Sequence, residues 1–161
     1  MLRPELDAAF RALIGHDLVF DALVLPRHLE NLLQLAERYP EMRIVIDHCA
    51  KPQIATGEIA AWTDAMARLA RNTRACCKLS GLVTEAGADW TVDRLRPVFD
   101  HVLECFGPQR LVWGSDWPVA TLAAGYADWV EATDLLLRES SSSERDAVLG
   151  GNAVSLYGLE A

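Results

Sequence analysis

RIVIDH (residues 43–48) is a short run of β-branched apolar residues that ends in two ionisable side chains. Such a run, bounded by polar sequence, is typical of a buried strand. Three more runs of this kind occur along the chain, at residues 18–24, 76–81 and 110–117. The strands lie near residues 18, 44, 76 and 111, roughly 26 to 35 residues apart, which is the spacing of successive βα units.

Each interval between these runs has apolar residues at helical spacing, and such helices are predicted at residues 27–39, 59–69 and 92–106. Parallel strands need crossover connections of this kind, and nearly continuous apolar strands suit a sheet covered on both faces. The sequence therefore predicts an α/β protein with a parallel sheet. An open doubly wound sheet and part of a barrel share this pattern, and four units are half of a (β/α)8 barrel of about 250 residues.

The composition excludes several classes of protein. The 161 residues are 51% hydrophobic and 24% charged, with a formal net charge of −8, which is ordinary for a globular domain. This acidic excess argues against nucleic acid or an anionic membrane as a partner. No apolar run approaches the ~20 residues of a membrane span, and the N-terminus does not resemble a signal peptide. The four cysteines form no C-x-x-C pair, so we expect reduced thiols in a cytoplasmic protein, folded as one domain over residues 1–161.

Two of the predicted strands end in groups that can carry chemistry, His48 and Asp116. Catalytic groups of α/β proteins lie at the carboxyl ends of parallel strands. Strand alternation places His48 on the face of Ile44 and Ile46, and Asp116 on the face of Gly114. We expect these two faces to be the inward one, so that the histidine and the carboxylate meet there. A carboxylate can act as general base, and an imidazole can polarise a carbonyl or bind a metal.

Simpler roles stay open at this point. A histidine after a strand is often a turn residue, and an aspartate before Trp-Pro is often part of a loop cap. Lys78 lies on a strand face with Ser80, where it either contacts an acidic substrate or only reaches solvent. The chain contains no G-x-S-x-G, no phosphate-binding glycine loop, no H-E-x-x-H and no H-x-H.

Longer motifs resemble a known family, the amidohydrolase-related TIM-barrel hydrolases, and within it the sugar-lactonase group of L-fuconolactonases and L-rhamnonolactonases. The similarity covers nearly the whole chain in collinear order. The motifs that carry it are IDHCAKP (46–52), CKLSGLVTEA (77–86), RLVWGSDWPV (110–119) and GGNAVSLYGL (150–159).

The resemblance implies the C-terminal half of a (β/α)8 barrel and a hydrolase of sugar-derived lactones. Asp116 matches the aspartate of the family's last strand, the general base, and His48 matches a histidine of an earlier strand. Lys51, Trp117 and Lys78 are expected to shape the substrate site. His48 and Asp116 are also the two candidate ligands for a divalent metal, zinc or manganese; metal use varies in the family, so a site with a metal and one without are both open.

Two departures from the family pattern matter. Ala50 stands where glycine usually precedes Lys-Pro, and the H-x-H motif of the family's first strand is absent. Pyrone-dicarboxylate hydrolysis or decarboxylation is the enzymatic alternative, and a catalytically inactive half-barrel or assembly subunit is the non-enzymatic one. We expect the isolated chain to self-associate or to require a missing N-terminal half, and to show little or no lactonase activity alone.

Overall fold

The computed structural model describes residues 1–159 of the chain. Four strands form one sheet in the order β1-β2-β3-β4, and every neighbouring pair is parallel. The strands are β1 (Val19–Ala22), β2 (Arg43–Ile46), β3 (Cys76–Leu79) and β4 (Leu111–Trp113). The predicted parallel α/β arrangement is therefore confirmed, with each predicted strand shortened at its carboxyl end.

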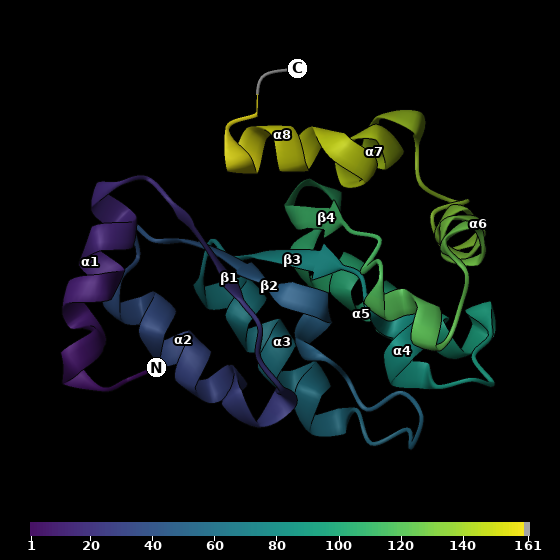
Figure 1. Ribbon diagram of the computed structural model, residues 1–161, viewed down its shortest axis with the longest axis horizontal. Coiled ribbons are helices and arrows are strands. Elements are labelled where there is room, and N and C mark those ends of the chain that lie inside the picture. Colours follow the sequence, from purple (N-terminus) through teal and green to yellow (C-terminus); the bar gives the residue numbers. More distant parts are fainter. Residues whose placement is uncertain (160–161) are drawn as a thin grey trace.

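Helices connect the strands as the periodicity predicts. The connections are made by α2 (Leu29–Arg38), α3 (Ala60–Asn72) and α5 (Val92–Phe106), while α1 (Asp7–Gly15) precedes the sheet and α6 (Tyr126–Leu136) follows it. A short helix that was not predicted, α4 (Leu82–Ala86), lies directly after β3. Pro97 lies inside α5, where the predicted helix continues through it. Figure 1 shows α2, α3 and α5 on one side of the sheet.

The two faces of the sheet differ sharply in chemistry. One face, which we call the helix-covered face, packs into the hydrophobic core under the connecting helices. Its strand residues are Ala22, Ile44, Ile46, Cys77, Leu79 and Leu111. The opposite face, which we call the polar face, presents Asp21, Val45, Cys76, Lys78 and Val112 in alternate positions. The core therefore lies on one side of the sheet, and ionisable groups gather on the other.

The C-terminal segment lies over the polar face (Figure 1). It runs from α7 (Ser142–Asp146) through a π-helical stretch (Ala147–Gly151) into α8 (Asn152–Tyr157). The helical path continues through Gly150 and Gly151. The side-chain amide of Asn152 donates to the carbonyls of Pro108 and Leu111, at 2.7 Å each, and so anchors α8 to the start of β4.

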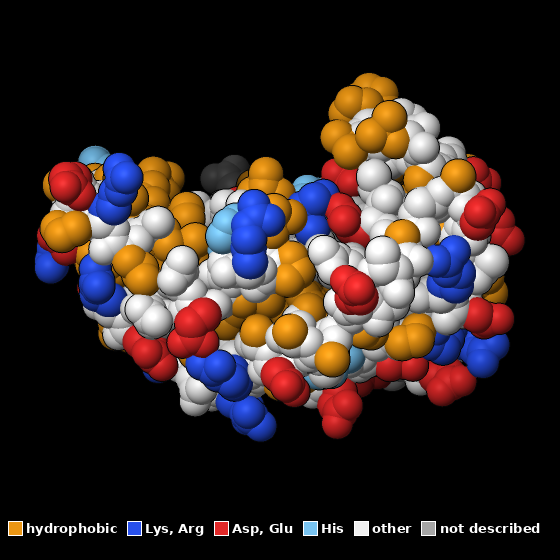
Figure 2. Space-filling model, turned by 90° about the horizontal axis from the view of Figure 1, so that it is seen from below, with side chains coloured by type: hydrophobic (Ala, Val, Ile, Leu, Met, Phe, Trp, Pro, Cys, Tyr) orange, Lys and Arg blue, Asp and Glu red, His pale blue; other side chains and the backbone are white. Residues whose placement is uncertain are grey.

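Charged side chains are dispersed over the outer surface. On the face shown in Figure 2, acidic and basic groups lie interspersed among hydrophobic ones. None of the helices in the described part of the chain has the length and apolarity needed to cross a membrane.

Arg110 connects two helix ends at the amino side of the sheet. Its guanidinium donates to carbonyls at the end of α5 (Cys105 and Phe106) and to Ala70, Thr73 and Ala75 near the end of α3, at 3.0 to 3.4 Å. Backbone carbonyls at helix ends lack partners within the helix, so this one side chain satisfies groups that would otherwise remain unpaired.

We predict that Arg110→Met lowers the free energy of unfolding by about 2–3 kcal/mol, because several carbonyls lose a charged donor together. The control is Arg68→Met, which removes an exposed ion pair with Glu30 and should change stability by no more than about 1 kcal/mol. Urea unfolding of both variants measures the difference. Equal losses in the two variants would contradict the role assigned to Arg110.

Candidate active site

His48 reaches the polar face through a break in strand geometry. β2 ends at Ile46, and residues 48–51 all have positive φ, between 49° and 58°. The expected alternation is wrong here: Ile44 and Ile46 face the helices, and His48 does not share their side. The left-handed turn reverses the direction of the side chain, so that His48 Nδ1 lies 2.7 Å from Ser80 Oγ and Nε2 lies 3.6 Å from Asp116 Oδ1.

Asp116 follows β4 by three residues and also has a positive φ, 54°. Its carboxylate is 10% exposed and the His48 side chain is 19% exposed. Gly114 lies on the polar face as expected, close to the side chains of Ser80 and Lys78. Trp113 points the other way, towards the helices, and its indole N–H donates to Thr133 Oγ1. The two residues predicted to form the site are thus brought together at the carboxyl ends of β2 and β4.

A second carboxylate, Asp47, stands beside His48, and its role was not predicted. Asp47 Oδ2 lies 3.3 Å from His48 Nε2, so two carboxylates flank this imidazole nitrogen. The other oxygen, Oδ1, is buried and lies 3.1 Å from Lys78 Nζ, as an ion pair rather than a well-aligned hydrogen bond. If β2 continued as a strand, the side chains of Asp47 and His48 would lie on opposite faces of the sheet. The left-handed turn brings both to the same site.

Lys78 is held between two carboxylates on the polar face. Its ammonium donates to Asp21 Oδ1 at 2.6 Å as well as contacting Asp47. Burial by itself lowers the pKa of Lys78, but the hydrogen bonds and the charges of Asp21 and Asp47 outweigh that effect and raise it. Lys78 therefore stays cationic and already has anionic partners within the chain.

Tyr157 completes this group from the far end of the chain. Its hydroxyl donates to the same Asp21 Oδ1 at 2.8 Å. Burial, together with this hydrogen bond, raises the pKa of Tyr157 to about 12. Tyr157 was not predicted for the site, whereas Asp21 has a signal in the sequence as an acidic residue within an apolar strand.

Lys51 and Trp117 occupy the loops expected for them. Lys51 ends the left-handed turn, and its ammonium forms an ion pair with Glu85 of α4, so that its side chain is only 30% exposed. Trp117 is 66% exposed directly after Asp116. It is free to contact a bound molecule at the edge of the site.

Zinc sites in enzymes normally take about three protein ligands. The structure over residues 1–159 contains no group of three or more His, Cys, Asp or Glu side chains placed to hold a metal ion. His48 and Asp116 supply two donors, which do not form a complete site in this chain.

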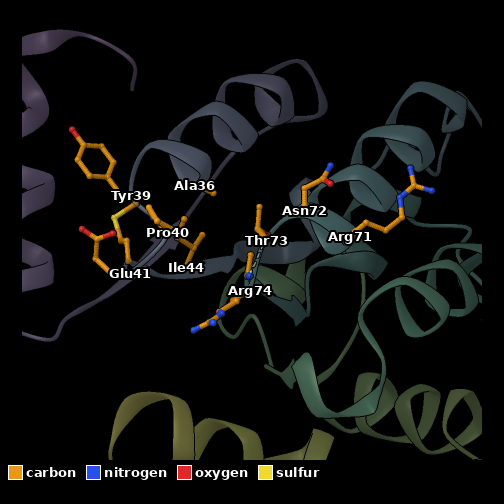
Figure 3. Close-up of a pocket in the computed structure, with 11 residues that line it drawn as sticks. Ala36, Tyr39, Pro40, Glu41, Ile44, Arg71, Asn72, Thr73 and Arg74 are labelled. Atoms are coloured by element: carbon orange, nitrogen blue, oxygen red, sulfur yellow. Dashed lines mark hydrogen bonds between the residues drawn. The ribbon is translucent and has the colours of Figure 1, made fainter.

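A pocket of about 540 Å³ lies at the opposite end of the strands, where α2 and α3 end and β2 and β3 begin. Figure 3 shows that Arg71 and Arg74 at its edge point away from each other. The pocket contains none of the residues that gather around His48. It is therefore separate from the candidate active site.

Functional groups at the carboxyl ends of parallel strands, as with His48 and Asp116 here, are typical of the active sites of α/β barrel enzymes. Comparison with known proteins gives the family: the amidohydrolase profile matches residues 2–159, so the chain belongs to the amidohydrolase family. A crystal structure of an amidohydrolase from Burkholderia multivorans with bound zinc superposes with a TM-score of 0.90 at 36% identity, covering 98% of this chain and 58% of that one. The predicted part of a (β/α)8 barrel is confirmed.

Two sequence relatives are L-fucono-1,5-lactonases. The Burkholderia ambifaria protein is 48% identical over 98% of this chain and 56% of its own length, and the Burkholderia multivorans protein is 37% identical over 90% and 53%. The chain thus spans about half the length of the curated relatives it matches. The predicted similarity to the sugar-lactonase group is confirmed.

Gly81 allows His48 to approach β3 closely. A Cβ atom at Gly81 would lie 3.0 Å from His48 Cβ and 3.2 Å from its Nδ1, and the φ of Gly81 is +71°. We predict that Gly81→Ala displaces the imidazole and costs roughly 1–3 kcal/mol of stability, from the left-handed backbone and the overlap.

Gly114→Ala is the matched control, because its new Cβ would meet Ser80 Cβ at an ordinary 3.4 Å and its φ is not positive. Denaturant unfolding should show a clearly smaller loss for Gly114→Ala. If the two alanine variants unfold at the same denaturant concentration, the close approach of His48 to Gly81 is refuted.

Proposed function

We propose that this chain forms part of a hydrolase of sugar-derived 1,5-lactones, in which Asp116 is the general base and His48 stabilises the oxyanion. The observation that carries the proposal is the 3.6 Å separation of His48 Nε2 and Asp116 Oδ1 at the carboxyl ends of two strands. The lactonase names of relatives at 48% and 37% identity support the choice of substrate class.

The geometry supports different roles for His48 and Asp116 in the reaction. When Ser80 donates to His48 Nδ1, the neutral ring carries its proton on Nε2, where it can donate to the carbonyl oxygen of the lactone. Asp116, beside Nε2, takes a proton from the attacking water. The water oxygen adds to the carbonyl carbon, and the ring C–O bond then breaks. Asp116 returns the proton to the departing oxygen, which becomes a hydroxyl group.

Other residues complete the proposal. Trp117 offers an exposed ring for contact with the sugar. The ion pair of Lys51 with Glu85 ties the loop after β2 to α4. Lys78 is proposed to contact polar groups of the substrate while held by its carboxylates. His48 and Asp116 are proposed as this chain's two donors to a zinc ion, supported by the zinc-containing relative. The proton transfers proposed for Asp116 do not depend on that ion. Four free thiols support a cytoplasmic location.

The substitution that tests this proposal is Asp116→Asn in two proteins. The first is the 161-residue chain, and the second is a chimera joining it to the part of the Burkholderia ambifaria lactonase that it does not match. We expect the chimera to hydrolyse L-fucono-1,5-lactone and the substitution to lower kcat by about 10²- to 10⁴-fold, since a general base is removed. The chain alone should remain near the uncatalysed rate.

Asp64→Asn, at an exposed position of α3, is the control and should leave kcat unchanged. An active chimera that is indifferent to Asp116→Asn would eliminate Asp116 as the base. Hydrolysis by the chain alone would contradict the expectation that it needs further structure.

We also propose that the isolated chain self-associates. Within the described sheet, β1 and β4 each pair with one neighbour only, so each leaves an edge of unpaired backbone groups. Leu18 and Leu23, beside the β1 edge, are 51% and 65% exposed. We expect sedimentation velocity at tens of micromolar, a working concentration of the order at which such edges associate, to show dimers or larger species. A single monomer peak at that concentration would contradict the proposal.

A further inference from the structure

Two buried tryptophans make the same contact behind the two proposed catalytic residues. Trp62, on the helix that follows β2, donates its indole N–H to the carbonyl of Cys49 at 2.7 Å. Trp129, on the helix that follows β4, donates its indole N–H to the carbonyl of Gly114 at 2.9 Å. Both tryptophans are 1% exposed. Cys49 is the residue after His48, and Gly114 lies two residues before Asp116.

These carbonyls lie where the strand has ended and the sheet no longer supplies donors. A buried carbonyl without a partner is unfavourable by roughly 1–3 kcal/mol, so a fixed donor at this point selects the local backbone path. This backbone conformation needs a fixed partner, because His48, Cys49 and Asp116 all have positive φ, which is unfavourable for residues other than glycine. Residues in this region persist only where the surroundings hold them.

The indole is well suited to this task. Its donor is on a large, rigid ring with two rotatable bonds, and in both cases the ring is packed among the helices of the core. The helix after each strand thereby reaches back to the end of that strand. No other contact within the described residues connects α3 to the carbonyl of Cys49 through a side-chain hydrogen bond.

We infer that Trp62 and Trp129 are positioning residues for the reaction: each fixes, through one backbone carbonyl, the turn that directs His48 or Asp116 onto the polar face. This inference rests on the roles proposed above for His48 and Asp116. It predicts that losing the indole N–H disturbs the site even when the aromatic volume is largely kept.

The first test is independent of catalysis. The 161-residue chain has four histidines, so ring-selective ¹³C labelling gives four signals, and His48→Gln assigns the signal of His48. We expect Trp62→Phe and Trp129→Phe to shift that signal. The control is Trp90→Phe, which removes an indole hydrogen bond to the carbonyl of Ala123, a residue that is adjacent in sequence to neither His48 nor Asp116, and should leave the signal in place.

A rescue experiment separates positioning from a direct effect of the altered ring. Ala50 has φ +58°, and glycine adopts this conformation without strain. Ala50→Gly in the Trp62→Phe background should therefore move the His48 signal back towards its original position. If Trp62→Phe does not fold, benzothienylalanine at position 62 replaces the N–H by sulfur and keeps the ring volume.

The second test uses the lactonase chimera. Trp62→Phe and Trp129→Phe should each lower kcat about tenfold or more with little change in KM, since small misplacement of catalytic groups is costly, and Ala50→Gly should restore part of the loss in Trp62→Phe. An unmoved His48 signal in both variants, or an equal shift in Trp90→Phe, overturns the inference. A shifted signal in an inactive chimera supports positioning and refutes the proposed function instead.

Discussion

The left-handed backbone of residues 48–51 is the constraint on which the arrangement of the candidate active site depends. Each residue in this conformation is disfavoured by roughly 1–2 kcal/mol, so four in succession require support from their surroundings. Cys49 provides much of it, since its carbonyl accepts from Trp62 and its thiol donates to the carbonyl of Lys78 at 3.3 Å. Without the turn, β2 would continue and His48 would point towards the helices.

The turn has this effect because the sheet separates apolar from ionisable groups. On the helix-covered face, Ile46, Cys77 and Leu79 are completely buried in the core. On the polar face, Lys78 balances Asp21 and Asp47, and α8 closes over them through Tyr157. A histidine placed on the first face would lack polar partners, while on the second it meets Ser80 and two carboxylates. Only on the polar face, therefore, does the histidine have neighbours with which it can form hydrogen bonds and exchange protons.

Much of this arrangement was predictable from the sequence, because it depends on periodicity. The four strands, the connecting helices and the facing of Trp113 and Gly114 follow from alternation and helical spacing. The position of His48 was predicted for the wrong reason, since alternation applies only while the strand continues, and β2 ends at Ile46. The family motif singled out His48 and Asp116 as site residues, although the backbone conformation of His48 was not evident from it.

Other features had no local signal. The role of Asp47 depends on the same turn, and Tyr157 reaches Asp21 from 136 residues away in the sequence. Such contacts are set by how α8 packs over the sheet, which single-sequence patterns do not encode. The substitution of alanine for the usual glycine at position 50 is informative in retrospect, because this position has φ +58°. A glycine preference in the family is the expected signature of a left-handed residue.

His48 and Asp116 interact directly across the polar face, with Nε2 and Oδ1 3.6 Å apart. The most direct measurement is their coupling free energy, from urea unfolding of the chain, His48→Gln, Asp116→Asn and the double variant. Residues in contact usually show a coupling of roughly 0.5–3 kcal/mol, whereas distant ones are additive within about 0.3–0.5 kcal/mol. We expect a coupling above about 0.5 kcal/mol for this pair. Additive effects of the two substitutions would contradict it.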